Sequence, residues 1–413
     1  MSGFNLSIAL QCPQCGAPAE LEETCRLFTC GFCRVKSYLV TKDCFRYVLP
    51  CPLPEEKELI RVPYWRFKGT LFSYTVKGIH KRFMDISQIA VSSPCFPTTL
   101  GLRTQAMTLH FLTPELPGYF LHPALSIREI MSGFTKRFGT SLPSPALHQE
   151  FIGENLSLIY APFYADGETM KDAVLEQSLS SRLPPAFSPG SLGKKAVPWQ
   201  MQFVPTLCPS CGWDLQGSPD ALVLTCHNCE SAWQPDGNRL ERITFGMFPA
   251  EEDSGRVWFP FWRIQAGVSG VRLQSYADLI RTANLIKVPQ KGDGDREFYF
   301  WAPAFKVQPR FILSLSRLMT LGQPGEKLLR KLPEDSVIPV NFPVREAAES
   351  LKMNLAGFIK PPIIEKKRMQ EIQVRPRKYL LVYIPFREDP HDYFQEKFQV
   401  TVNKNMLKLS QNL

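Results

Sequence analysis

The sequence predicts an α+β protein with an internal duplication, in which each half is a small cysteine-rich unit followed by a mainly antiparallel β domain with one or two helices. Three observations lead to this prediction. Two sets of four cysteines have identical internal spacing, and matching landmarks follow each set in the same order. Within these landmarks, apolar and polar residues alternate as they do along half-buried strands.

Each half begins with two pairs of cysteines that are separated by fourteen residues. The two sets are Cys12, Cys15, Cys30, Cys33 and Cys208, Cys211, Cys226, Cys229. Four thiolates in two close pairs match a tetrahedral structural zinc site, and they leave no coordination position for a catalytic water. Gly16 and Gly212 follow the second cysteine of each set, where the chain must turn back over the metal. We expect two Zn²⁺ ions, one for each set, although the same ligands also suit iron.

Three pairs of segments recur after the cysteines in the same order. They are residues 62–67 with 259–264, 119–124 with 299–304, and 158–163 with 381–386. Each segment has a proline inside an apolar run, which is typical of edge strands and bulges. Helices are expected to begin near Arg128 and Arg310, and the second half has a longer helical segment over residues 343–358.

These landmarks predict the domain boundaries. We expect cysteine-rich units at 8–42 and 204–238, α+β domains at 43–177 and 239–413, and a linker at 178–203. The linker begins with a run of serine, proline and glycine that continues to Lys195, a composition typical of connections between domains.

One repeated strand in each half carries an aromatic–arginine face. Alternation places Tyr64 and Arg66 on one face of the first strand, and Phe261 and Arg263 on the corresponding face of the second. Such a face can bind a partner, for instance by stacking bases while the arginine contacts phosphate. Aromatic residues beside an arginine more commonly pack in a core, which is the stronger interpretation.

A basic segment distinguishes the second half from the first. Residues 360–378 contain seven basic and two acidic residues. The candidate contacts to an anionic partner are Lys366, Lys367, Arg368, Arg375, Arg377 and Lys378. Nucleic acid, a membrane surface or an acidic protein would suit these residues, and a solvated loop explains them at least as well.

Composition sets broad limits on the class of protein. The 413 residues carry a net charge of +9, with 44% hydrophobic and 21% charged residues, as in a globular protein with real cores. No run of eighteen apolar residues occurs, and the N-terminus lacks the pattern of an export signal. Four cysteines outside the metal sets have no counterparts in the second half, so we expect free thiols and a cytoplasmic location.

The cysteine sets carry a resemblance to a known kind of domain. Residues 12–16 (CPQCG) and 208–212 (CPSCG), with their second cysteine pairs, resemble the zinc ribbons of transcription factors and RNA polymerase subunits. The whole chain is similar to bacterial proteins in which a zinc ribbon precedes a β-rich domain with proline–aromatic strands. The resemblance implies metal binding but no single activity, because ribbons serve nucleic-acid binding, protein docking and folding alike.

Three functional hypotheses follow from the sequence. The first is a non-catalytic adaptor or assembly protein whose two ribbons mediate contact with another protein. The second is a nucleic-acid-binding protein that uses the ribbons and the basic stretch 360–378. The third is an enzyme with a site between the two halves, although we find no nucleophile elbow, His–Glu zinc motif or dinucleotide fingerprint.

Overall fold

The fold is mixed α+β, with mostly antiparallel strands and few helices, as the sequence predicts. The computed structural model describes residues 5–51, 58–182, 197, 199–250, 255–334, 336–359 and 368–410. None of the helices in these ranges is long and apolar enough to cross a membrane.

A ten-stranded sheet is the main element of the first half. Its strands are β1 (Ser7–Gln11), β2 (Pro18–Glu22), β5 (Phe45–Val48), β6 (Ile60–Thr75), β7 (Gly78–Ile89), β8 (Leu109–Phe111), β9 (Tyr119–Phe120), β10 (Ala146–Asp166), β11 (Thr169–Asp172) and β12 (Ser178–Arg182). The order β12-β11-β10-β5-β8-β1-β2 forms one path, while β6 pairs with β10, β7 and β9. The first cysteine-rich hairpin, β1–β2, is therefore part of the large sheet rather than a separate unit.

A six-stranded sheet occupies the second half. Its strands are β17 (Phe245–Met247), β18 (Arg256–Ser269), β19 (Phe300–Pro303), β20 (Gln373–Glu388), β21 (Asp392–Gln395) and β22 (Val400–Asn403). They run in the order β19-β18-β20-β21-β22, and β17 pairs with β20.

Two small sheets contain the remaining strands near the metal sets. One has the order β13-β4-β3, and the other β14-β15-β16. Their bounds are β3 (Leu27–Thr29), β4 (Lys36–Val40), β13 (Gln202–Pro205), β14 (Leu224–Cys226), β15 (Ser231–Asp236) and β16 (Arg239–Ile243).

The helices are short. They are α1 (Arg103–Ala106), α2 (Ile127–Gly139), α4 (Tyr276–Thr282), α5 (Pro309–Gly322), α6 (Val344–Glu349), α7 (Leu351–Phe358), a 3₁₀ turn η1 (Arg368–Gln370) and α9 (Lys404–Ser410). Ser126 and Glu129 form a capping box at the start of α2, which satisfies the free N–H groups there. The helix expected over 343–358 is present as α6 and α7, with Pro343 as the N-cap of α6.

The central strands of the two halves pair in the same register. Leu158 of β10 lies opposite Trp65 of β6, and Leu381 of β20 lies opposite Trp262 of β18. A bulge begins three residues beyond each tryptophan, and a short strand, β5 or β17, runs parallel to β10 or β20 on its other side. The repeated segments at 62–67, 158–163 and their counterparts thus occupy equivalent places.

The remaining pair of repeated segments is placed differently in the two halves. Tyr119 of β9 pairs with Ile60 in a parallel arrangement, whereas Phe300 of β19 pairs with Ile264 in an antiparallel one. The likeness between residues 119–124 and 299–304 therefore does not extend to strand direction.

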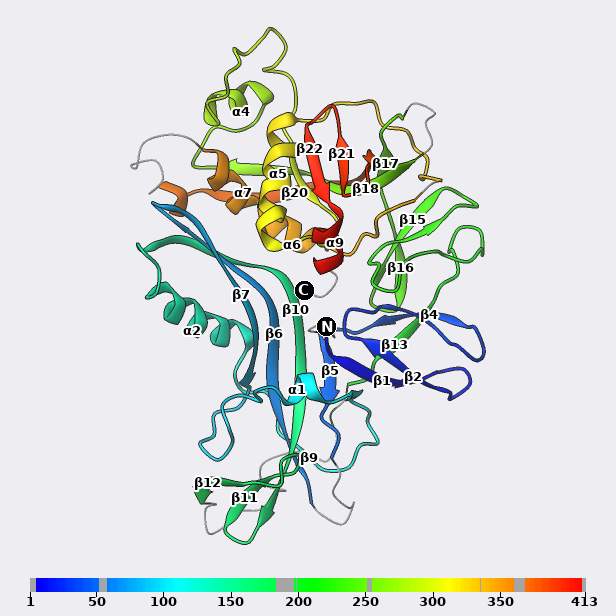
Figure 1. The fold of residues 1–413 in the computed structure, drawn as a ribbon, viewed down its shortest axis with the longest axis vertical. Helices are drawn as coiled ribbons and strands as arrows, with labels where there is room; N and C mark the ends of the chain where they lie inside the picture. The colour runs from blue at the N-terminus through cyan, green and yellow to red at the C-terminus, as the bar shows by residue number, and fades with distance from the viewer. Residues whose placement is uncertain are drawn as a thin grey trace.

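The two halves pack on each other through the long hairpins of the first. The ends of β6 and β7 contact α7, and β10 contacts α6 (Figure 1). Phe72, Tyr74 and Ile152 from these strands belong to the same apolar cluster as the core of the second half. The core of the second half therefore extends into the first half, whose own main core is a separate cluster.

The expected linker is partly built into the sheets. Its first residues form β12, which pairs with β11, and its last residues include the start of β13, which pairs with β4. Residues 183–196 and 198 lie outside the described part of the chain.

Candidate metal centres

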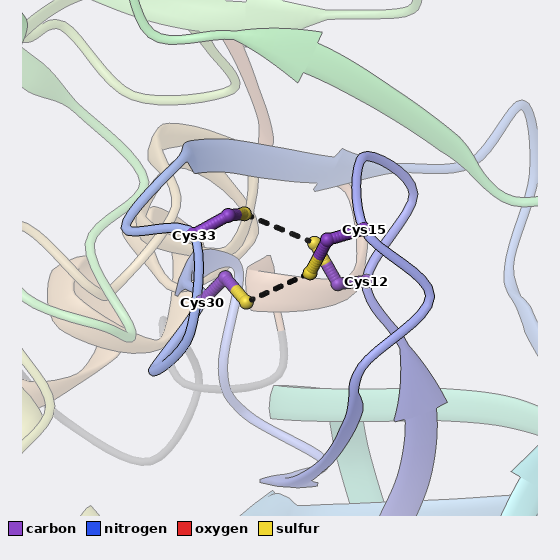
Figure 2. Close-up of side chains that lie close together, drawn as sticks. All are labelled: Cys12, Cys15, Cys30 and Cys33. Atoms are coloured by element: carbon purple, nitrogen blue, oxygen red, sulfur yellow. Dashed lines mark hydrogen bonds between the residues drawn. The ribbon is translucent and has the colours of Figure 1, made fainter.

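The first cysteine set comes together at the tips of two hairpins. Cys12 and Cys15 lie in the turn between β1 and β2, and Cys30 and Cys33 in the turn between β3 and β4 (Figure 2). The Sγ atoms of Cys12 and Cys33 are 3.7 Å apart, as are those of Cys15 and Cys30. All four Sγ atoms lie within 4.8 Å of one another.

The second set has the same arrangement. The Sγ atoms of Cys208 and Cys229 are 3.6 Å apart, and those of Cys211 and Cys226 are 3.5 Å apart. These four Sγ atoms also lie within 4.8 Å of one another. In both sets the first and third cysteines are buried and the second is exposed.

These separations fit a four-coordinate metal and exclude disulfides. A tetrahedral site with Zn–S bonds of about 2.3 Å places its sulfurs about 3.8 Å apart. A disulfide would require about 2.05 Å, and all twelve cysteines are free. Each cluster can therefore hold one ion through four sulfurs, which leaves no open coordination position.

In all four turns that carry the cysteines, the residue after the second cysteine of the pair has a left-handed backbone conformation. Gly16 and Gly212 have φ of 72° and 74°, as predicted for the turn back over the metal. Arg34 and Glu230, which follow the last cysteine of each set, have φ of 59° and 48°. Neither residue type indicates a left-handed conformation, so the sequence did not reveal that the second turns match the first.

The turn backbone favours the thiolate form at one buried cysteine of each set. The N–H groups of Cys33 and Phe32 lower the pKa of Cys30 to about 6. Burial raises the pKa of Cys208, but the N–H groups of Ser210 and Cys211 outweigh it and lower that pKa to about 6. Thiolates are the form that binds metal, so the turn backbone stabilises the required charge at these two sulfurs.

Ser231 is a polar neighbour of the second cluster that the spacing analysis missed. It is fully buried, and its Oγ lies 3.0 Å from the Sγ of Cys229 and 3.7 Å from that of Cys208. The Nε1–H of Trp233 donates to the same hydroxyl at 2.8 Å, which leaves the hydroxyl proton free to face a sulfur. The first set has Val35 at this place, so the two clusters differ in their surroundings.

The two cysteine-rich units, 8–42 and 204–238, are called the metal units below, and they pack against each other. Strand β13, which leads into the second set, pairs with β4 of the first. The hydroxyl of Tyr38 donates to the carbonyl of Ala221 at 2.9 Å, and the N–H groups of Arg26 and Leu27 donate to the carbonyl of Pro219 at 2.7 and 2.8 Å. One apolar cluster is shared between them, formed by Leu27, Tyr38, Val40, Val204, Cys208, Leu215, Ala221, Leu224, Cys226 and Trp233.

The candidate partner-binding residues of the two central strands are largely buried. Tyr64, Arg66 and Phe261 are at most 1% exposed, so the half-buried strand expected from alternation is buried on both faces. The tyrosine hydroxyl donates to the carbonyl of Pro97 at 2.8 Å. Arg263 is partly exposed, and its guanidinium stacks on the ring of Tyr299 at 4.6 Å.

Arg66 belongs to a buried cluster of charges. It pairs with Glu23, and its Nη2 lies 3.1 Å from Oδ2 of Asp85. Lys68, two residues along the same strand, approaches Glu23 at 3.7 Å and donates to Asn5 at 2.7 Å. Glu23 of the first metal unit thus packs over this face of β6. The contact joins residues far apart in the sequence, and strand alternation does not reveal it.

The basic segment is described only in part. Lys366 and Lys367 lie outside the described residues, and Arg368 is in η1. Arg375, Arg377 and Lys378 are exposed at the start of β20. These three residues, with the 48% exposed Tyr379, form a basic strand on the surface, rather than a loop.

Two exposed aromatic residues lie beside the cysteine clusters. Phe32, between the last two cysteines of the first set, is 74% exposed, and Trp213, next to Gly212 in the second, is 60% exposed.

Comparison of the chain with protein-family models, with curated proteins and with solved structures finds no match. The ribbon resemblance therefore rests on the geometry of the cysteines.

Proposed function

We propose that this chain is a non-catalytic zinc-binding adaptor, in which two zinc ribbons at 8–42 and 204–238 dock onto another protein. The observation that carries the proposal is the pairing of each closed four-cysteine cluster with an exposed aromatic residue, Phe32 or Trp213. Large exposed aromatic residues are typical anchors of protein interfaces.

The donor set supports zinc in a structural role. Four thiolates at tetrahedral spacing satisfy Zn²⁺ completely, and a site without an open position has no place for an activated water. Each ribbon is too short to bury a core of its own, so metal binding would supply much of its folding free energy.

The charge of the second ribbon favours a protein partner over nucleic acid. Between residues 204 and 238 there are four acidic side chains and no lysine or arginine. A zinc ion bound by four thiolates adds two further negative charges. Phosphate backbones would be repelled from this ribbon, because nucleic-acid affinity depends on basic contacts.

We further propose that the two halves arose by duplication of one ribbon-plus-β unit. The shared register of β6–β10 and β18–β20, with a bulge at the same distance from each tryptophan, supports this origin. Duplication would explain why both halves carry a ribbon, and the differing charge and surroundings of the ribbons would then reflect divergence.

A capture experiment with matched variants tests the adaptor proposal. Phe32→Ser combined with Trp213→Ser should abolish capture of a stoichiometric protein partner from native lysate, because the exposed anchors are gone. Leu102→Ser is the control, since Leu102 is 75% exposed and lies outside both ribbons. A partner that binds the double variant as well as the control variant, or the absence of any partner, would contradict the docking surface.

Metal analysis tests the zinc assignment separately. The purified chain should contain close to two zinc atoms by mass spectrometry, one for each four-cysteine cluster. Material with neither zinc nor iron would overturn the assignment. Two iron atoms per chain would instead show that the clusters are rubredoxin-like iron sites.

A second function is favoured by the exposed basic strand of β20. Arg375, Arg377 and Lys378 could contact phosphates while Tyr379 stacks on a base, as in single-strand binding surfaces. Filter binding of single-stranded oligonucleotides should then weaken steeply with salt and with the triple change Arg375→Gln, Arg377→Gln and Lys378→Gln. No retention at low salt would exclude this function.

A further inference from the structure

A pocket of about 230 Å³ lies where the two halves meet. The hairpin β6–β7 of the first half contributes Lys81 and Phe72, which lie opposite each other in register. Helices α5 and α7 of the second half form the other walls. Figure 1 shows the upper ends of β6 and β7 beside α7, so the pocket is completed only when both halves are in place.

Three cations line this pocket. Arg310 and Arg317 lie on α5 at a spacing of seven residues, which places them on one face with Ser314 between them. Lys81 faces them from β7. Within the described parts of the chain, no carboxylate lies within ion-pair distance of any of the three.

The cations are close enough to affect one another. Partial burial lowers the pKa of Lys81, and the charge of Arg310 lowers it further. Arg310 is also held against the ring of Phe311 at 4.6 Å, in the first turn of α5, where the helix dipole favours negative charge. Positive groups held together without a counter-charge attract an anion.

The floor of the pocket carries an unsatisfied acceptor. Asn354 of α7 lines the pocket and is 1% exposed. Its Nδ2 donates to Oγ1 of Thr320 at 3.1 Å, while its Oδ1 has no hydrogen-bond partner among the described residues. A buried amide oxygen without a donor is costly, so it calls for a donor from a ligand.

We propose that this junction pocket binds a small phosphate monoester that also carries a hydroxyl group. Lys81, Arg310 and Arg317 would hold the phosphate dianion, for which the planar guanidinium fork is well suited. The ligand hydroxyl would donate to Oδ1 of Asn354. The volume is below the range of about 300–1,000 Å³ that is usual for drug-sized ligands, so the ligand is smaller than a nucleotide.

Titration calorimetry on the full metal-loaded chain at low salt tests the site with three probes. Glycerol 3-phosphate should bind in a one-to-one ratio, inorganic phosphate more weakly, and glycerol not at all. Arg310→Gln and Arg317→Gln should each weaken both phosphate probes about tenfold or more, because each removes a charge-assisted contact. Arg345→Gln is the matched control, since Arg345 is 87% exposed on α6 and outside the pocket.

Asn354→Ala separates the two parts of the proposed ligand. It should remove the preference for glycerol 3-phosphate over inorganic phosphate and leave the affinity for inorganic phosphate in place. Because Asn354 is buried, the urea midpoint of the Asn354→Ala variant is measured to check that it folds. If it does not fold, the variants of the exposed Arg310 and Arg317 still test the site.

Several results would overturn the proposal. These are the lack of saturable binding of either phosphate probe at millimolar concentration, equal weakening by the Arg345→Gln control, and a preference for glycerol 3-phosphate that survives Asn354→Ala. Displacement of glycerol 3-phosphate by a single-stranded oligonucleotide, dependent on Arg310 and Arg317, would assign the pocket to nucleic acid instead.

Discussion

Arg66 shows that alternation can predict the strand face of a residue, and that packing in a core was the stronger interpretation of this face, while its charged partners stay unknown from the sequence. Alternation places it beside Tyr64 on one face of β6, as the sequence predicts. Its partner Glu23 comes from the first metal unit, and both side chains are almost fully buried. Contacts between residues far apart in the chain decide such burial, and a single sequence gives no direct information about them.

The buried pair makes a prediction about stability. Arg66→Met should reduce the free energy of unfolding by roughly 3 kcal/mol, because Glu23 would stay buried with one counter-charge fewer. Urea unfolding measures the loss, and Arg345→Met at an exposed pair should cost less than about 0.5 kcal/mol. Adding Glu23→Gln to Arg66→Met should cost less than the sum of the single changes; strict additivity would show that the pair is not coupled.

At the scale of elements, the metal units were the most predictable part of the chain. Cysteine spacing and two glycines were enough to place all eight sulfurs in two clusters and to foresee the left-handed turns at Gly16 and Gly212. The pairing of β13 with β4, which joins the units, had no signal in the sequence. Sheet partners are chosen by long-range packing, whereas metal ligands are visible in residue type and spacing.

The shared packing of the metal units predicts that they lose structure together. Cys211→Ala should lower the metal content from two ions to one and also reduce hydrogen-exchange protection of β3 and β4 in the other unit. The reason is that the first unit packs on the second through Tyr38 and β13. Cys95→Ala, which changes a cysteine outside both sets, is the control; unchanged protection in β3 and β4 would mean that the units fold independently.

For the whole molecule, the sequence predicted the mixed α+β class and the positions of the two central strands of each half, but not that these strands pair with each other. It did not predict that Phe72, Tyr74 and Ile152 of the first half would pack into the core of the second, because strand length beyond the proline segments has no clear end signal. The reversed direction of β19 relative to β9 was missed for a similar reason. Local pattern indicates a strand but not which neighbour it joins.

Buried ionisable groups in the two cores predict sensitivity to alkaline pH. Burial raises the pKa values of Cys44 and Tyr160 to about 12, and that of Tyr383 as well. The folded state then holds protons that the unfolded state releases above about pH 9, so stability falls as pH rises from 9 toward 12. Burial lowers the pKa of Lys68, so this group by itself makes stability rise with pH over the pH interval just below 10.5.

Urea midpoints between pH 8 and 11 measure this effect. The midpoint should decline over that range, and Cys44→Ala should make the decline less steep because one raised pKa is removed. Cys95→Ala should leave the steepness as in the parent chain. A midpoint that rises through this range would contradict the sign of the linkage.

The pairing of β13 with β4 also bears on how the chain is made. During synthesis, β4 emerges long before residues 202–205, so the edge that β13 will cover stays open while the whole β domain of the first half is being translated. A ribosome that stalls within that interval would release a polypeptide with an unprotected template for aggregation. We therefore expect the timing of translation, and not only the finished contacts, to affect how much of this protein reaches its native state.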